Sequence, residues 1–230
     1  MSVTRKPKYP PAICRKRVSA RDTGSGFSMV ELLIVVTVMA VMTAIAQISL
    51  RPLMNQAHVT NAYNTSLMAL RLGREKAVEE KGAYKVTFNG ASAITVAPVT
   101  TAMAACGGSA GAATWTGAQT YNYSLPSDVS FQIIPGVPTG PTATPDGFGI
   151  AAYAVDFDQL AGGNSSSVIF CADGSAQDSN GQFNNGVVYM ARTGELYSSR
   201  AITLWGITGR LRGWRLLQSG SCGTTCWSQQ

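Results

Sequence analysis

The side chains that usually carry catalysis are sparse in this chain of 230 residues, which contains a single histidine, His58. That histidine falls in a helical pattern among polar neighbours, so we expect a solvated helix residue and no pairing with a serine or cysteine nucleophile. Asp156 and Asp158 share one face of an expected strand; an exposed turn or strand end is favoured over a Ca²⁺ site. Gly162-Gly163 precedes no helix and so forms no phosphate-binding loop. We therefore predict that the protein is not an enzyme and has no cofactor.

Four of the five cysteines follow the basic N-terminal segment: Cys106, Cys171, Cys222 and Cys226. An even number in an oxidising compartment predicts disulfides, with three pairings open. We favour Cys222 with Cys226, which would close a small C-terminal loop, and Cys106 with Cys171. A metal site is not expected, because no Cys-x2-Cys pair accompanies the single histidine.

An arginine-rich stretch near the C-terminus, Gly209-Arg210-Leu211-Arg212-Gly213-Trp214-Arg215, could bind an anion. In a strand, Arg210, Arg212 and Trp214 would point to one side, and a bulge at Gly213 would turn Arg215 to join them. Guanidinium groups about 6–7 Å apart approximate the spacing of successive phosphates, and the tryptophan could stack on a base. This pattern predicts DNA binding. The alternative is an edge strand whose arginines deter aggregation or meet acids of another subunit.

Glu31 is the single ionisable residue of an apolar run from Phe27 to Ile48, 22 residues long. At about 1.5 Å per residue this run is long enough to span a bilayer as a helix. A carboxylate at the centre of such a helix costs about 2.5–3.5 kcal/mol, and somewhat less near its end. The position of Glu31 therefore indicates a function.

The stretch Gly26-Phe27-Ser28-Met29-Val30-Glu31-Leu32 resembles the class III signal of type IV pilins and type II secretion pseudopilins. The resemblance implies that prepilin peptidase cleaves between Gly26 and Phe27, that Phe27 is then N-methylated, and that Glu31 serves filament assembly. Two other interpretations are open. One is a plain membrane anchor; the other is a secretory signal peptide cleaved after Ala44-Ile45-Ala46, although the apolar run is longer than such peptides have.

Charge is distributed unevenly along the chain. The net charge of +6 belongs to residues 1–26, and the remainder is neutral overall. Positive flanks stay cytoplasmic, so the chain after the helix is expected in the periplasm. Between Val86 and Ala191 there are acids and no Lys or Arg, whereas the segment from Arg200 onward has four arginines and no acid. This segregation suggests head-to-tail contacts or an anionic ligand at the basic end; simple solvation of both faces is an equally open interpretation.

The rest of the chain predicts a helix followed by short strands. Helical spacing resumes after Arg51-Pro52, where we expect a kink or break, and Gly82 should end the helix. One stripe of this amphipathic half contains Tyr63, Leu67, Leu70, Arg74 and Ala77. Expected strands are 84–88, 93–97, 121–123, 129–134, 168–170, 187–190, 196–197, 201–205 and 210–217, with loops at 100–117 and 135–149.

Further motifs resemble the GspH/FimT branch of that pilin family. They are residues 70–77 followed by 84–88, the strand and Asp-Gly turn of Val168–Ser175, and Gly-Arg-Leu-Arg at 209–212, which matches a Gly-Arg-x-Arg motif. The resemblance to FimT-type minor pilins implies that this last motif binds double-stranded DNA during natural transformation.

The implied fold is α+β: a long N-terminal helix, half transmembrane and half amphipathic, packed on a small antiparallel β-sheet domain. The expected divisions are a cleaved leader (1–26), a membrane or filament-core helix (27–50), an amphipathic helix (51–82) and a periplasmic β-rich head (83–230). The implied function is that of a minor pilin or pseudopilin of a type IV pilus or a type II secretion system. Its partners would be other pilin subunits, prepilin peptidase and the bacterial inner membrane. The alternative is an anchored periplasmic binding domain that enters no filament.

Overall fold

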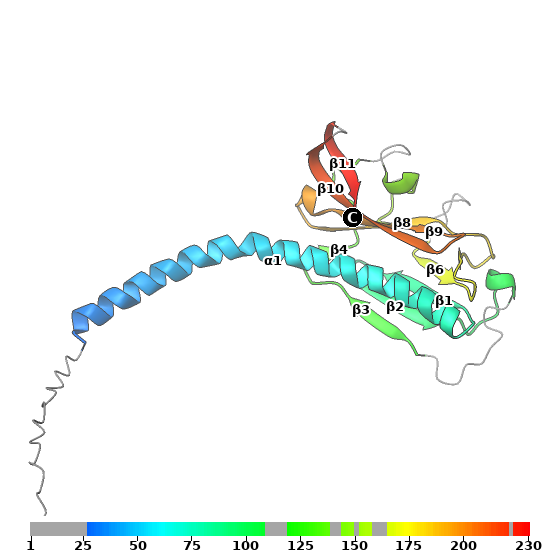
Figure 1. Ribbon diagram of the computed structural model, residues 1–230, viewed down its shortest axis with the longest axis horizontal. Coiled ribbons are helices and arrows are strands. Elements are labelled where there is room, and N and C mark those ends of the chain that lie inside the picture. The colour runs from blue at the N-terminus through cyan, green and yellow to red at the C-terminus, as the bar shows by residue number, and fades with distance from the viewer. Residues whose placement is uncertain (1–26, 109–118, 139–143, 150–151, 158–164, 221–222) are drawn as a thin grey trace, which may run out of the picture. The chain divides into compact units, whose positions relative to one another are not determined.

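The computed structural model describes residues 27–108, 119–138, 144–149, 152–157, 165–220 and 223–230 (Figure 1). The predicted leader, residues 1–26, lies outside the described residues. Contacts divide the chain into two units, one ending at Ile48 and one extending from Ser49 to Gln230, close to the boundary expected at residue 50. Each unit is described by itself below.

One helix, α1, runs from Met29 to Glu79. Of the kink or break expected at Pro52, the break is absent, because the helix continues through this residue: proline removes one helical hydrogen bond, but Pro52 is exposed, so water can replace the missing donor. The helix also ends before Gly82. Lys81 adopts a positive φ of 52°, and the Gly82 amide donates to the Ala77 carbonyl oxygen over 3.0 Å, which closes the C-terminus as a Schellman motif.

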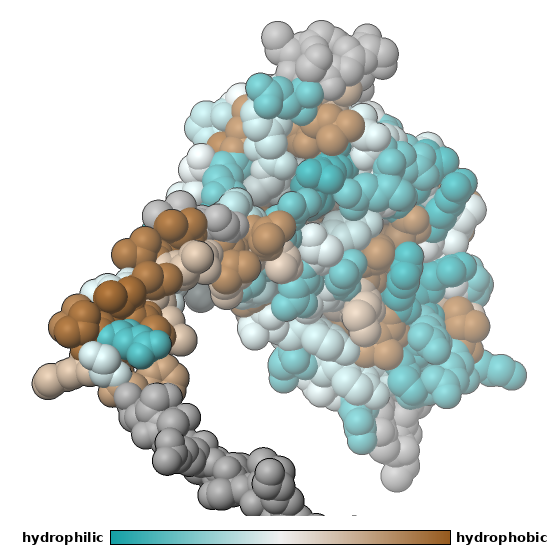
Figure 2. Space-filling model, turned by 60° about the vertical axis from the view of Figure 1, so that its left-hand side comes forward, coloured by the Kyte–Doolittle hydropathy of each residue, from teal (hydrophilic) through white to brown (hydrophobic). Residues whose placement is uncertain are grey.

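In the first unit, α1 is long and apolar enough to cross a membrane by length and composition. Its large side chains are exposed; Phe27, just before the helix, is 78% exposed, and Figure 2 shows this segment as an almost continuous hydrophobic surface. An apolar helix with no protein packed on it is not stable in water, because each exposed side chain forgoes about 1.5–3 kcal/mol of burial. Lipid or neighbouring helices would supply that burial.

The second unit contains two antiparallel sheets, where one small sheet was expected. The first has the order β3-β2-β1-β6-β7 and the second β11-β10-β9-β8-β4, with β5 also paired to β8. The strands of the first sheet are β1 (Tyr84–Asn89), β2 (Ala93–Pro98), β3 (Tyr121–Ser124), β6 (Ser167–Phe170) and β7 (Ala176–Gln177). Those of the second are β4 (Val129–Ser130), β5 (Val155–Phe157), β8 (Gly186–Arg192), β9 (Arg200–Trp205), β10 (Arg210–Gly220) and β11 (Gly223–Gln229).

Within the described residues, three short 3-10 helices lie between the strands: η1 (Ala105–Gly108), η2 (Pro145–Gly147) and η3 (Leu196–Ser198). The strand expected at 196–197 is therefore wrong, since a single 3-10 turn connects β8 to β9 there. The strand expected at 129–134 ends at Ser130. The sequence pattern missed β5, β7 and β11, because two are very short and β11 is largely polar; each is formed by pairing with a neighbour.

The amphipathic part of α1 packs on both sheets. Leu67, Leu70 and Ala77 of the predicted stripe are buried, in one core with side chains of β1, β2, β6, β8 and β9. Gly73 allows the closest approach, because a Cβ atom there would lie 2.5 Å from Val86 Cγ2. Arg74 is exposed rather than buried; its guanidinium reaches across to donate to the carbonyl oxygens of Gly174 and Thr208.

Candidate functional site

The expected processing and assembly residues lie at the start of the first unit. Gly26 is outside the described residues, so the structure gives no geometry for the Gly26–Phe27 bond. Glu31 lies exposed in the first turn of α1, where a carboxylate is favoured by the partial positive charge of the helix N-terminus. Its carboxylate has no ion-pair partner among the residues from 27 onward that the structure describes. It is therefore free to accept one from another molecule.

The arginine strand is β10, and its register decides where its side chains lie. The pairing with β9 runs without interruption from Arg210 opposite Trp205 to Arg215 opposite Arg200. The bulge expected at Gly213 is therefore wrong. Arg210, Arg212 and Trp214 share one face as predicted, but Arg215 lies on the other face, against α1. Gly213 is in close contact there, since a Cβ atom would lie 1.7 Å from Tyr63 Oη.

Arg212 forms an ion pair with a buried carboxylate that the sequence did not predict as its partner. Asp146, in η2, has a side chain only 5% exposed and accepts from Arg212 Nη1 at 2.7 Å. It also accepts from Thr203 Oγ1 at 2.6 Å and from Trp205 Nε1 at 3.2 Å. The Arg212 guanidinium also lies 5.8 Å from the centre of the Trp205 ring. We call these four residues the Asp146 network.

Trp214 is likewise engaged within the protein. Its Nε1 donates to Thr203 Oγ1 over 3.0 Å, and its ring packs in a small cluster with Phe148 and Trp227. Arg215 therefore lies on the opposite face of the strand from Arg210. Trp214 lies on the same face as Arg210, but its contacts within the protein prevent it from stacking freely on a base. Of the four residues proposed to contact DNA, Arg210 alone is exposed.

Arg210 instead belongs to a groove of about 760 Å³ that sequence spacing could not reveal. The groove lies between the last turns of the helix and the β9–β10 turn. Arg71 and Arg74 line it from α1, together with Glu75 and Glu79. Three arginines from two distant segments therefore share one surface, with two carboxylates beside them.

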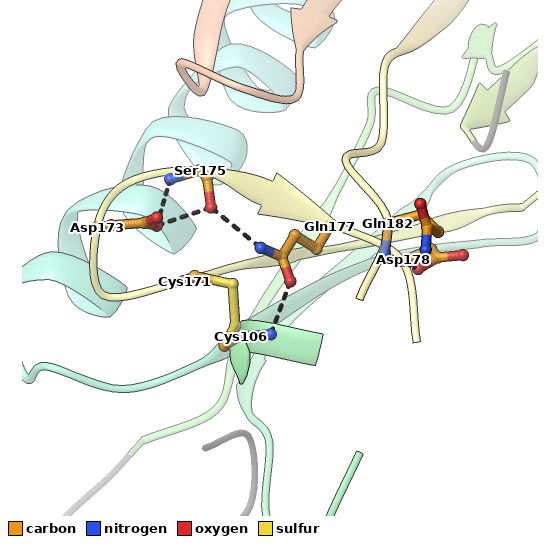
Figure 3. Close-up of a disulfide and its surroundings, with 7 residues drawn as sticks. All are labelled: Cys106, Cys171, Asp173, Ser175, Gln177, Asp178 and Gln182. Atoms are coloured by element: carbon orange, nitrogen blue, oxygen red, sulfur yellow. Dashed lines mark hydrogen bonds between the residues drawn. A yellow bond between two sulfur atoms is a disulfide. The ribbon is translucent and has the colours of Figure 1, made fainter. Parts of the chain in front are cut away.

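A disulfide links η1 to the end of β6 (Figure 3). Cys106 and Cys171 are joined as predicted, with their Cα atoms 5.3 Å apart and a separation of 65 positions in sequence. The Cys106 amide also donates to Gln177 Oε1 at 2.7 Å. Cys222, the expected partner of Cys226, lies outside the described residues. The predicted Cys222–Cys226 disulfide therefore stays a prediction.

The turn after Cys171 has the geometry that its Asp-Gly sequence predicted. Gly174 adopts a φ of 81°, and the Asp173 carboxylate accepts from the Ser175 hydroxyl at 2.7 Å and from the Ser175 amide at 2.9 Å. These two hydrogen bonds lower the pKa of Asp173 below its ordinary value. The turn thus has a built-in dependence on an ionised carboxylate.

His58 is not simply solvated, as expected, but faces a carboxylate. Its Nδ1 lies 2.9 Å from Asp128 Oδ1, and Arg192 Nε lies 3.1 Å from the other oxygen of the same carboxylate. Burial alone would raise the pKa of Asp128, but the hydrogen bonds with His58 and with the backbone, together with the neighbouring Arg192, outweigh it and lower that pKa. This group ties α1 to β8 and to the turn before β4.

The acids between residues 86 and 191 do not form the acidic surface that charge segregation suggested. Asp146, Asp156 and Asp178 are buried, and Asp128 is ion-paired. Asp158 lies outside the described residues, so the expected shared face of Asp156 and Asp158 has no described geometry. The acids mainly satisfy donors of this same chain.

Sequence reasoning missed Asp146 because Pro-Asp-Gly is typical of a surface turn, and it missed Arg71 because nothing local connects a helix position to residue 210. Among the described residues, no group of three or more His, Cys, Asp or Glu side chains could hold a metal ion. Comparison with protein-family models, with curated proteins and with solved structures finds no match to this chain.

Proposed function

We propose that this protein is a minor pilin or pseudopilin, cleaved by prepilin peptidase between Gly26 and Phe27 and assembled into a filament. The observation that carries the proposal is the position of Glu31, five residues into the segment that follows Gly26, at the start of an exposed apolar helix. The layout of the chain supports it: one helix continues from that apolar segment into a β-rich unit and packs on its sheets.

The chemistry of assembly follows from these positions. Cleavage would create an amine at Phe27, at the edge of the apolar segment. When helices leave the bilayer and pack together, the Glu31 carboxylate of one subunit can pair with the Phe27 amine of the next. In a dry helix bundle an unpaired carboxylate is costly, so the pairing selects one axial register between neighbouring subunits.

The mature N-terminus tests this proposal directly. We expect mass spectrometry of the membrane-extracted protein to show a chain beginning at Phe27 with one added methyl group. A Gly26→Val variant should accumulate as the uncleaved precursor, because the bulkier side chain occupies the cleaved position. A mature chain that begins elsewhere would overturn the proposal and leave an anchored periplasmic domain that enters no filament.

Two machines could use such a subunit. Membership of a type II secretion system predicts that deletion abolishes export of folded proteins, whereas membership of a type IV pilus predicts loss of twitching or of DNA uptake. Complementation of the deletion with the wild-type chain separates the two in one strain. Restoration of neither phenotype would argue against both.

DNA binding is a second candidate function, favoured by the groove that Arg71, Arg74 and Arg210 share. Phosphate contacts from clustered arginines account for most sequence-independent DNA affinity, and each lost contact reduces the salt dependence of binding. In gel-shift titrations of the full-length chain in detergent, Arg210→Gln and Arg71→Gln should each weaken retardation. Arg212→Gln should not, because Asp146 already neutralises Arg212. No retardation at low salt would remove this function.

A further inference from the structure

A second pocket, of about 490 Å³, lies beside α1 where the helix enters the second unit. Its wall is formed by Pro52, Asn55 and Val59 of the helix, by the turn containing η3, and by Arg200 and Arg215. The groove of Arg71, Arg74 and Arg210 is a separate site with no lining residue in common.

Two arginines face each other in this pocket without a carboxylate between them. Arg200 on β9 is directly opposite Arg215 on β10, and Arg200 is only 4% exposed. The Arg200 guanidinium has only long hydrogen bonds, of 3.4 and 3.3 Å, to the carbonyl oxygens of Ser198 and Ser199. In the part of the chain that the structure describes, neither arginine has an ion-pair partner.

Donors beside this pair also lack partners. The buried Nε of Arg215 and the buried hydroxyl of Ser199 make no hydrogen bond within the described residues. Glu195 lines the same pocket, and one oxygen of its carboxylate pairs with Arg192 rather than with either of the two arginines. The pocket therefore keeps two positive charges and unused donors.

Such an arrangement is unfavourable unless an anion occupies it. Like charges directly opposite on paired strands repel, and a buried unpaired charge costs several kcal/mol. Burial and the neighbouring Arg215 lower the pKa of Arg200 to about 10, which still leaves the Arg200 guanidinium charged at neutral pH. Loss of a proton does not relieve the repulsion under ordinary conditions.

We propose that Arg200 and Arg215 form a binding site for a phosphate group, supplied by the headgroup of a phospholipid. Planar guanidinium groups bind phosphate through paired, charge-assisted hydrogen bonds, which would use the free donors. Pro52 follows Ile48, the end of the apolar run, by about 6 Å of helix. Headgroups lie immediately outside the hydrocarbon core, and Leu53 and Met54 next to the pocket are exposed apolar residues suited to that level.

The choice of a lipid as the source rests on the membrane-anchored state in the proposed function. A soluble phosphate has the same chemistry, so the experiment must distinguish the two. Full-length protein in a zwitterionic detergent is titrated separately with dioctanoyl phosphatidylglycerol, dioctanoylglycerol, inorganic phosphate and acetate. Thermal unfolding is followed by tryptophan fluorescence.

We expect phosphatidylglycerol to raise the unfolding temperature and dioctanoylglycerol to leave it unchanged. Stabilisation by inorganic phosphate to the same extent at equal concentration would support the phosphate site and remove the lipid as its specific source. Stabilisation by acetate alone would indicate a protein carboxylate as the occupant and overturn the proposal. No stabilisation by either phosphate compound would also overturn it.

Arg215→Gln is the decisive variant, and Arg210→Gln is its matched control on the same strand. Arg215→Gln should weaken phosphatidylglycerol binding by about 10- to 100-fold, the effect of losing one charged hydrogen-bond donor. Without ligand it should be no less stable than the wild type, because it removes a like charge next to Arg200. Arg210→Gln should bind as the wild type does; an equal loss in both variants would indicate unspecific attraction and refute the site.

A measurement on the wild-type chain covers the case in which Arg215→Gln fails to fold. Phenylglyoxal labelling of Arg215, measured by mass spectrometry, should slow in the presence of phosphatidylglycerol, while labelling of Arg210 stays constant. Equal labelling of Arg215 with and without the lipid would refute the proposal. These results are independent of the mature N-terminus, so the filament proposal and the phosphate site can fail separately.

Discussion

At the scale of single residues, the charges of this protein mostly neutralise one another inside it. Asp146 holds Arg212, and Asp128 holds His58 and Arg192. An arginine whose charge is neutralised by a buried acid no longer attracts an external anion. Arg200 and Arg215 lie at least partly buried and have no acid partner among the described residues, so they are more informative than the arginine motif itself.

Substitution of Asp146 should destabilise the second unit. Asp146→Asn removes the counter-charge of Arg212 and weakens the bonds from Thr203 and Trp205; the partly buried position of Arg212 limits the cost to about 1–3 kcal/mol. Chemical denaturation followed by tryptophan fluorescence measures this cost. Glu79→Gln, which breaks an exposed pair with Lys76, is the control and should cost much less than Asp146→Asn. Equal effects would contradict the Asp146 network.

The lowered pKa of Asp173 predicts that the folded protein loses stability at acidic pH. Its folded-state pKa is lower than its ordinary value of 3.8, so its contribution is present above that value and lost as pH falls through the folded pKa. We expect the unfolding temperature to fall between about pH 5 and pH 2, and to fall less steeply in Asp173→Asn. Ser175→Ala, which keeps the amide donor, should show an intermediate slope. An unchanged slope in Asp173→Asn would show that the turn does not depend on ionisation.

At the scale of elements, β10 has two faces with different tasks. One face carries Arg212 into the Asp146 network and Trp214 against Thr203, and the other carries Leu211, Gly213 and Arg215 toward α1. A one-residue bulge would have exchanged these faces beyond Gly213. The uninterrupted register with β9 is thus what separates Arg215 from Arg210 and places it opposite Arg200.

The contact between α1 and β10 depends on the absence of a side chain at Gly213. In Gly213→Ala the new methyl group would collide with Tyr63 Oη, and we expect a loss of about 1–3 kcal/mol in unfolding free energy. Tyr63→Leu shortens the opposing side chain and should make the alanine substitution nearly neutral in the double variant. A double-mutant cycle measures this coupling. Simple additivity of the two changes would contradict the contact.

The disulfide fixes η1 against the end of β6 across a long loop. Cross-linking residues 65 apart removes about 4 kcal/mol of chain entropy from the unfolded state in the entropic account. Replacement of Cys106 and Cys171 by serine should lower the unfolding free energy by about 2–4 kcal/mol. Cys14→Ser, in the leader, is the control and should have no effect on the processed protein. Loss of less than about 1 kcal/mol would show that the loop is already ordered when reduced.

At the scale of the whole molecule, one helix serves two environments. From Met29 to Ile45 it exposes apolar side chains that need lipid or other helices, and from Val59 it packs on the two sheets. A rod with this composition exchanges lipid contacts for helix contacts at little net cost in hydrophobic burial. In the filament that we propose, the Glu31 carboxylate would then decide the register of assembly.

Glu31 tests that account at the level of the assembled filament. Glu31→Ala should be cleaved like the wild type, because the scissile bond lies five residues earlier, but its incorporation into sheared filaments should fall. Glu31→Asp, which keeps the charge on a shorter side chain, should recover part of that incorporation. Quantitative immunoblots of membrane and sheared fractions measure both. Normal incorporation of Glu31→Ala would refute the charge-pairing account.

The sequence by itself determined the features that depend on local patterns. The apolar run from Phe27, the helix through Leu70, the Asp-Gly turn at Asp173 and most strands of the two sheets follow from hydrophobic periodicity and turn chemistry. The pairing of Cys106 with Cys171 was favoured from the sequence and is present in the structure.

Only the tertiary structure decided which charges meet. Asp146 and Arg212 are 66 residues apart, and Arg71 reaches the surface of Arg210 from a different element. Arg200 and Arg215 face each other because of a strand register that one bulge would have changed. Such contacts depend on how distant segments pack, and local periodicity contains no information about that.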